Sequence, residues 1–151
     1  MDIYKVLEWS DELSVGIQEI DEQHKYLVGL VNDLNEALIT RGGTDAVRET
    51  FDRLIEYTRT HFVVEESLMR ILGYPEYDSH KHSHEQLLAQ VLEFKERFET
   101  EHRVHRRELM EFLKQWLTQH IMKEDMLYSD HFLSRGAHSS WLKPSWLKRF
   151  W

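Results

Sequence analysis

The chain has 151 residues with six Gly, two Pro and no Cys, a length and composition suited to one globular domain. The lack of Cys excludes disulfides, thiolate-bound zinc, iron–sulfur clusters and thiol catalysis, and a formal charge of −8 argues against nucleic-acid binding. No apolar run is long enough to cross a membrane, and the first ten residues do not resemble a secretory signal, so we expect a cytoplasmic protein. The unusual feature is the presence of ten His.

Hydrophobic spacing and turn residues predict four long helices. Gly42-Gly43 separates the first from the second, Pro75 separates the second from the third, and a polar stretch at 100–103 precedes the fourth. Short connections between long helices favour an all-α fold, an up-down-up-down antiparallel four-helix bundle with an N-terminal arm. The predicted helices span residues 17–40, 45–72, 77–99 and 104–130, and the last of them is expected to direct Leu127 into the core.

Charge is distributed unevenly along the chain. All 27 Asp and Glu lie at or before residue 130, whereas residues 131–151 hold four Lys or Arg, three of the five Trp and no acid. We therefore divide the chain into an acidic helical body, residues 1–130, and a basic aromatic C-terminal tail, residues 131–151. Three roles stay open for the tail: packing on the bundle or on a second copy of the chain, docking on a protein partner, or anchoring at an anionic membrane surface.

Several His and carboxylate side chains fall at one level of the predicted bundle. His24 lies 18 residues before Gly42 and His61 lies 18 residues after Gly43, so antiparallel neighbours place them side by side. Similar counts from the other turns bring in residues of the third and fourth helices. The residues expected to converge are His24, His61, Glu65, His80, His84, His120 and Asp125.

Local spacing supports a metal site at this level. His61 with Glu65 and His80 with His84 are i,i+4 pairs, whose side chains share one face of a helix. A single buried His is more often a hydrogen-bonded core residue than a ligand, but a set drawn from four helices favours metal binding. Five imidazoles and two carboxylates exceed the needs of one ion and suit two ions of iron, zinc or manganese that share the carboxylates.

The last pair has an irregular spacing. His120 and Asp125 are five residues apart, and a regular α-helix turns their side chains about 140° away from each other. A π-type bulge would return both side chains to one face, and such bulges are frequent at functional sites. We therefore predict distorted backbone hydrogen bonding near residues 119–125.

The motifs around these residues resemble those of the hemerythrin family. His61-Phe-Val-Val-Glu-Glu-Ser-Leu-Met69 resembles its H-F-x-x-E-E-x-x-M motif, and His80-Lys-His-Ser-His84 resembles its H-K-x-x-H motif. The segment 15–25 resembles the start of its first helix, and 116–128 resembles its last motif, with the same His-to-Asp spacing. The resemblance covers about residues 7–130 and is to the prokaryotic single-domain members, the bacteriohemerythrins.

This resemblance implies a non-haem di-iron centre that binds O2 reversibly. One iron would take three imidazoles and the other two, and two carboxylates with an oxo or hydroxo group would bridge them. The second iron would keep one open position, where O2 would bind. The residues in those roles are His80, His84 and His120 for the first iron, His24 and His61 for the second, and Glu65 and Asp125 for the bridges.

By position, an apolar wall of Leu27, Phe62, Trp116 and Leu117 would surround the open position. Such a wall excludes water and protons, slows oxidation to the diferric state and offers no general acid to cleave the O–O bond. We therefore expect oxygen carriage, storage or delivery to an oxygen-using enzyme, and no enzymatic activity. The alternative is sensing of O2, nitric oxide, redox state or iron. A ferritin-like oxidase is disfavoured because its repeated Glu-x-x-His signature is absent.

Overall fold

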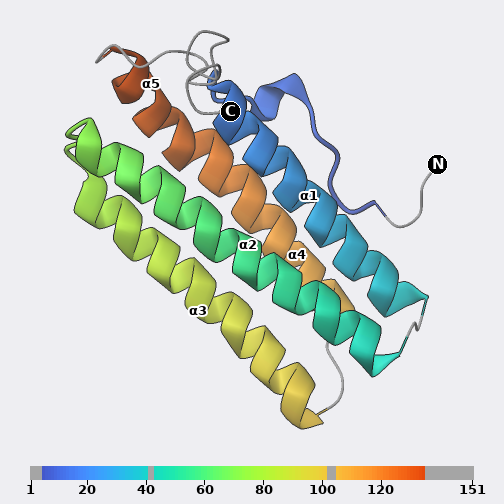
Figure 1. Ribbon diagram of the computed structural model, residues 1–151. Helices are drawn as coiled ribbons and strands as arrows, with labels where there is room; N and C mark the ends of the chain where they lie inside the picture. Colours follow the sequence, from blue (N-terminus) through green and yellow to red (C-terminus); the bar gives the residue numbers. More distant parts are fainter. Residues whose placement is uncertain (1–4, 41–42, 102–104, 135–151) are drawn as a thin grey trace, which may run out of the picture.

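The computed structural model describes residues 5–40, 43–101 and 105–134, and within them it contains helices but no strands. Four long helices lie side by side in alternating directions, and α5 continues along the line of α4 (Figure 1). The predicted antiparallel four-helix bundle is confirmed. The elements are η1 (Asp11–Leu13), α1 (Gln18–Ile39), α2 (Thr44–Ile71), α3 (Tyr77–Glu101), α4 (Arg106–Gln119), η2 (His120–Asp125) and α5 (Met126–Ser134).

The connection between α2 and α3 shows how the turn residues act. Gly73 has a φ of 66°, a left-handed conformation that glycine adopts without a steric penalty, and it follows the last turn of α2. The Tyr74 N–H then donates to the Met69 carbonyl at 2.8 Å, and α3 begins two residues after Pro75. The connection after α3 lies slightly later than predicted, because the helix continues through Glu101.

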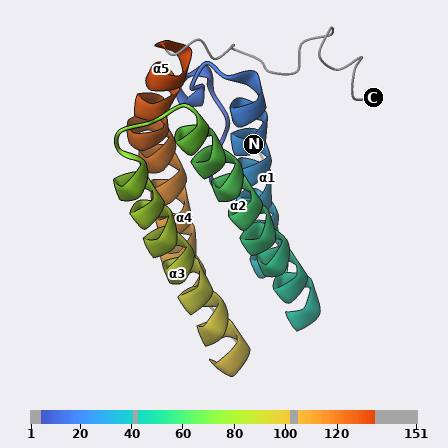
Figure 2. The same ribbon diagram turned by 60° about the vertical axis from the view of Figure 1, so that its left-hand side comes forward.

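The two halves of the bundle have different cores. The apolar half, which we define as residues 28–58 and 88–115, is filled by side chains such as Phe51, Leu54 and Leu113, all 0% exposed. Its rings pack together, as in the Phe51–Phe98 pair with centroids 6.2 Å apart. The polar half, residues 18–27, 59–87 and 116–134, contains most of the buried polar side chains. The polar half includes the α2–α3 turn and α5, which lie at the same end of the molecule (Figure 2).

The π-helix η2 confirms the predicted distortion at residues 119–125. It covers His120–Asp125 and separates α4 from α5. One extra residue per turn rotates the following side chains by about 100° relative to a regular helix. For that reason one sequence prediction was wrong: Leu127, expected in the core, is 63% exposed, and Tyr128 is buried in its place.

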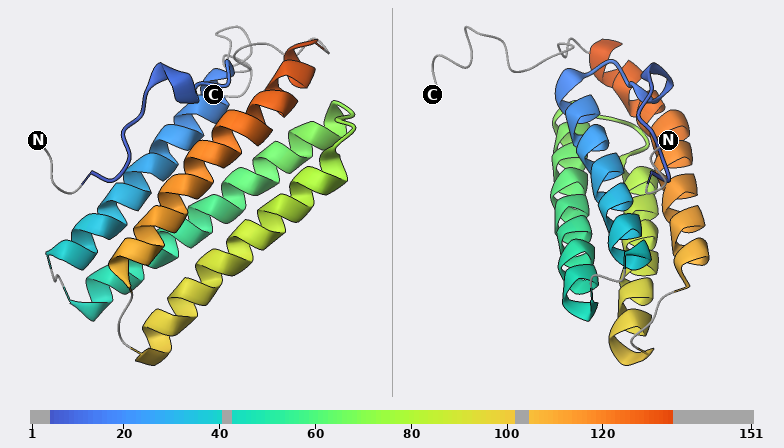
Figure 3. Two further views of the ribbon diagram at one scale, coloured as in Figure 1. Left: turned by 180° about the vertical axis from the view of Figure 1, so that it is seen from behind. Right: turned by 90° about the vertical axis from the view of Figure 1, so that its right-hand side faces the viewer.

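The N-terminal arm before α1 is fastened to the bundle by side chains. Asn32 accepts from the Val6 N–H at 2.8 Å and donates to the Leu7 carbonyl at 2.8 Å, which holds the arm along α1 (Figure 3). Asp21 accepts from the Ser14 hydroxyl at 2.6 Å and so fixes the start of the helix. In the described residues, no helix is long and apolar enough to cross a membrane.

At the other terminus, α5 continues through Ser134, so the first four residues of the predicted tail are helical. Residues 135–151 lie outside the described residues, as do Gly42 and His102. The division at residue 130 and the three roles considered for the tail therefore stay predictions.

Candidate metal centre

All seven predicted ligand residues meet in the core of the polar half. They come from α1, α2, α3 and η2, and each is at most 5% exposed. Their donor atoms form two groups in which all atoms lie within 4.8 Å of one another, and two carboxylates belong to both groups. The three-imidazole group contains His80, His84 and His120 and the two-imidazole group contains His24 and His61, each together with Glu65 and Asp125.

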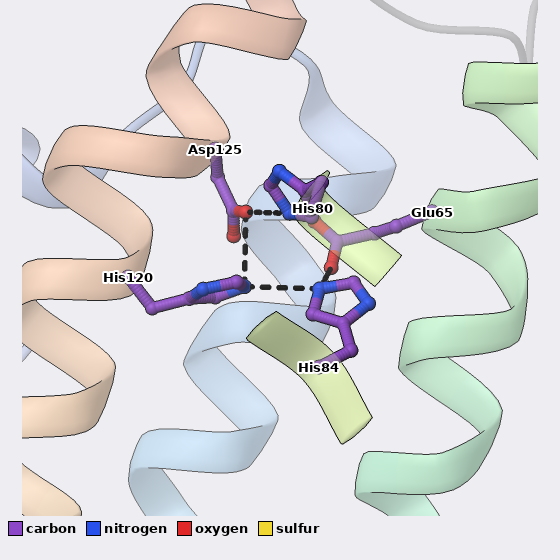
Figure 4. Close-up of side chains that lie close together, drawn as sticks. All are labelled: Glu65, His80, His84, His120 and Asp125. Atoms are coloured by element: carbon purple, nitrogen blue, oxygen red, sulfur yellow. Dashed lines mark hydrogen bonds and ion pairs between the residues drawn. The ribbon is translucent and has the colours of Figure 1, made fainter. Parts of the chain in front are cut away.

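The three-imidazole group lies around one side of the Asp125 carboxylate. Asp125 Oδ1 is 3.2 Å from His80 Nε2 and 3.1 Å from His120 Nε2. His84 Nε2 is 3.1 Å from His120 Nε2 and 3.4 Å from Glu65 Oε1. The close-up shows the three rings and both carboxylates directed toward a common centre (Figure 4). This is a convergence of donor atoms suited to a single ion.

The two-imidazole group uses the other oxygen of Asp125 but the same oxygen of Glu65, Oε1. Asp125 Oδ2 lies 3.0 Å from His24 Nε2, and Glu65 Oε1 lies 3.0 Å from His61 Nε2. Asp125 thus presents one oxygen to each group, which is the arrangement of a bridging carboxylate.

The hydrogen bonding of these atoms fits bound metal. Among the described residues, the Nε2 atoms of His24, His61 and His80 and both oxygens of Asp125 have no hydrogen-bond partner. Buried polar atoms are nearly always partnered, and buried carboxylates are paired or coordinate metals. Nitrogen and oxygen donors without thiolate suit iron, zinc or manganese. The residues present therefore fit two metal ions.

Three of the imidazoles form a hydrogen bond to a second side chain through Nδ1, on the side of the ring away from the cluster. In each case Nδ1–H donates outward to an oxygen, which leaves the Nε2 lone pair directed into the cluster. The pairs are His61 with Gln23 Oε1 at 2.6 Å, His84 with Glu66 Oε2 at 2.9 Å and His120 with Glu124 Oε2 at 2.7 Å.

None of these outer partners was predicted from the sequence. Gln23 and Glu66 each stand next to a predicted ligand in the chain, yet each holds an imidazole of another helix. Glu124 holds His120 at i,i+4 spacing, which was an available signal in the sequence. Tyr128 was also missed; its hydroxyl donates to Glu65 Oε2.

The electrostatics of the cluster favour bound cations. Burial raises the pKa of Asp125, but the imidazoles around it, His120 foremost, outweigh burial and hold its pKa well below the usual range. Burial lowers the pKa of His120, but Asp125 and Glu124 outweigh burial and raise it to about 10. Without metal, the carboxylates stay ionised in the core and draw protons onto a neighbouring ring. That positive charge is what metal ions supply.

The four predicted wall residues are all buried, with exposed fractions of 1% for Leu27, 4% for Phe62, 5% for Trp116 and 1% for Leu117. The Phe62 ring stacks on His84 with centroids 3.7 Å apart, and it lies 6.0 Å from the rings of His61 and His120. Trp116 meets Phe62 edge-on at 6.2 Å. Trp116 also lines a cleft of about 610 Å³ whose walls are residues of α3, α4 and η2.

An antiparallel four-helix bundle with two overlapping His/carboxylate groups defines a class of proteins that bind a pair of metal ions between helices. Comparison with known proteins gives the family. Residues 15–131 match the family model of the hemerythrin HHE cation binding domain. The chain belongs to the hemerythrin family.

Individual relatives agree with this result. The chain is 36% identical to a bacteriohemerythrin of Stenotrophomonas maltophilia over 96% of this chain and 97% of that protein. It is 37% identical to a bacteriohemerythrin of Pseudomonas aeruginosa over 95% and 97%. A solved structure of wild-type hemerythrin superposes with a TM-score of 0.76 at 29% identity, covering 82% of this chain and 95% of that one. The first two matches extend into most of the tail, so the tail is a segment shared with these relatives.

Proposed function

We infer that this protein binds O2 reversibly at a non-haem di-iron centre. The observation that carries this function is the pair of donor groups sharing Glu65 and Asp125, in a chain of the hemerythrin family. When bound there, two ferrous ions would supply the two electrons that O2 binding requires and would recover them on release. The protein supplies the geometry, the charge and the exclusion of water.

We propose that the seven converging side chains are the iron ligands. The two donor groups support this assignment, because each combines imidazoles with the same two carboxylates. Asp125 directs one oxygen toward each group, which suits a bridge. In this proposal His80, His84 and His120 hold one iron, His24 and His61 hold the other, and Glu65 and Asp125 join them.

We also propose that the protein carries oxygen without consuming it. The support is the apolar character of the predicted wall, since buried Leu27, Phe62 and Leu117 have no group that donates a proton to bound oxygen. A dry apolar wall keeps O2 binding reversible because loss of reduced oxygen requires water or protons. Cytoplasmic oxygen carriage, storage or delivery is the role that we assign to it.

A visible spectrum with iron analysis on one sample tests this function. The protein is reduced without air, exposed to air and then purged. We expect two irons per chain and a charge-transfer band that appears with air and fades on purging. Permanent conversion to the diferric form in a single exposure would contradict reversible binding.

A pair of matched variants tests the ligand assignment. Glu65→Ala removes a shared carboxylate and is expected to lower iron content from two per chain to less than one. Glu56→Ala, an exposed position on the same helix, is the control and should retain both irons. Full iron loading of Glu65→Ala would contradict the proposed bridge.

A further inference from the structure

The three-imidazole group and the two-imidazole group differ in the side chains that accept hydrogen bonds from their imidazoles. In the three-imidazole group, His84 and His120 donate to the carboxylates of Glu66 and Glu124, which we call the outer carboxylates. In the two-imidazole group, His61 donates to the neutral amide of Gln23. The Nδ1 atom of buried His24 has no hydrogen-bond partner among the described residues. Outer negative charge is therefore placed on one side of the cluster.

Outer partners change how strongly an imidazole donates to a metal. A carboxylate that accepts from Nδ1–H raises the basicity of the ring, whereas an amide oxygen does so much less because it carries no net charge. A more basic ligand and a nearby negative charge both stabilise the higher oxidation state of iron. Glu66 is 19% exposed and Glu124 is 42% exposed, so water screens the charge of Glu66 less.

We propose that Glu66 and Glu124 are positioning residues that make the three-imidazole pocket the one that prefers ferric iron. When a one-electron oxidant takes a single electron from the diferrous protein, the electron leaves the iron held by His80, His84 and His120. The iron held by His24 and His61 stays ferrous. This inference rests on the proposed di-iron function, and it means that the outer carboxylates protect the oxygen-accepting iron from outer-sphere oxidation.

A redox titration of the iron-loaded protein, followed by electron paramagnetic resonance, tests the proposal. The half-oxidised pair has an odd number of electrons and gives a signal whose yield reports the gap between the two potentials. Glu66→Gln should raise the first potential by about 59 mV, equal to a tenfold change in equilibrium constant, and Glu124→Gln should raise it by a smaller amount. Both should leave the second potential unchanged. Gln23→Glu should lower the second potential and leave the first unchanged.

Glu85→Gln is the matched control, because Glu85 is exposed on α3 next to His84 and loses the same charge. Its two potentials should equal those of the unmodified protein. The proposal is overturned if Glu66→Gln and Glu124→Gln shift the second potential while Gln23→Glu shifts the first. It is also overturned if all three behave like the control. Reversible O2 binding is recorded on the same samples, so failure of the oxygen function is seen separately.

A second measurement serves if a variant loses iron. In zinc-loaded protein, which needs no redox chemistry, the Nδ1 protons of His84 and His120 should resonate further downfield than that of His61. The displacement should be lost for the ring whose carboxylate is replaced by Gln. Equal shifts for the three protons would show that the outer partners do not distinguish the pockets, and would overturn the proposal.

Discussion

The apolar half and the polar half of this bundle are built from the same four helices but are stabilised in different ways. In the apolar half, residues such as Leu34, Phe51 and Leu109 are fully buried against one another, and burial of their surface stabilises the fold directly. In the polar half, imidazoles and carboxylates occupy the core, and three of them, His24, Glu65 and Asp125, are completely buried. Buried ionisable groups cost free energy unless ions or hydrogen bonds compensate them.

This difference indicates that the two halves have different roles. We therefore expect the apolar half to hold the helices together by itself and the polar half to depend on metal for its order. The π-helix η2 and the outer partners Gln23, Glu66 and Glu124 are all in the polar half, where they orient ligands. A change in one half should therefore leave the other half largely unaffected.

Removal of iron should have the largest effect. A ligand that binds only the folded state stabilises it by about 4 kcal/mol when present at 1,000 times its dissociation constant. Iron-free protein should therefore unfold at lower denaturant, and amide hydrogen exchange should accelerate first in η2 and α5. Exchange measured residue by residue should stay slow around Phe51 and Leu113. Equal acceleration in both halves would remove the distinction between them.

Leu54→Ala tests the apolar half by itself. Leu54 is 0% exposed, and truncation of such a side chain leaves a cavity that costs about 2–5 kcal/mol of unfolding free energy. Urea unfolding should show this loss, while iron analysis should still find two irons per chain. Loss of iron in a folded Leu54→Ala protein would mean that the two halves are coupled. Val63→Ala, at an exposed position on the same helix, is the control and should change little.

Leu117→Ser tests the apolar wall of the polar half. A buried hydroxyl admits water and protons, so oxidation of the oxygen-bound protein to the diferric state should accelerate about tenfold, which corresponds to about 1.4 kcal/mol in the barrier. The decay of the oxygen-dependent absorption band measures this rate. Leu117→Ile, which keeps the site apolar, should decay at nearly the original rate. Equal decay rates in the Ser and Ile variants would argue against the wall.

The smallest effect is expected where the halves meet. Burial, with a smaller contribution from Tyr26, raises the pKa of Tyr57 above its usual value. Because the folded-state pKa is the higher one, the stabilisation is complete below pH 10 and is lost as the pH rises through the folded value. Between pH 9 and 11, unmodified protein should lose more unfolding free energy than Tyr57→Phe, by under about 1 kcal/mol because the phenol is partly exposed and screened. Identical slopes in urea unfolding would contradict this.

The sequence was sufficient for the helices and for the convergence of the ligands, because both depend on periodicity and on distances counted from turns. It also indicated the π-helix, since the five-residue spacing of His120 and Asp125 is incompatible with a shared face in a regular helix. The exposure of Leu127 was not predicted, because the bulge changes the direction in which every later side chain of the helix faces. The spacing of apolar residues near Leu127 does not show that a bulge earlier in the helix has rotated the side chains that follow it.

The outer partners Gln23 and Glu66 could not be predicted, for a different reason. Gln23 holds His61 and Glu66 holds His84, so each contact joins two helices and depends on side-chain rotamers. Sequence neighbours give the level of such a residue in the bundle, but the helix packing decides which ring it reaches. The difference between the two imidazole groups therefore appears only in three dimensions.

Anomalous diffraction at the iron absorption edge is the most direct test of the central claim that the polar half holds two irons. Crystals of iron-loaded protein should show two peaks inside the cluster, one among His80, His84 and His120 and one beside His24 and His61. Glu65 and Asp125 should contact both. A single peak, or peaks outside these seven side chains, would contradict the account.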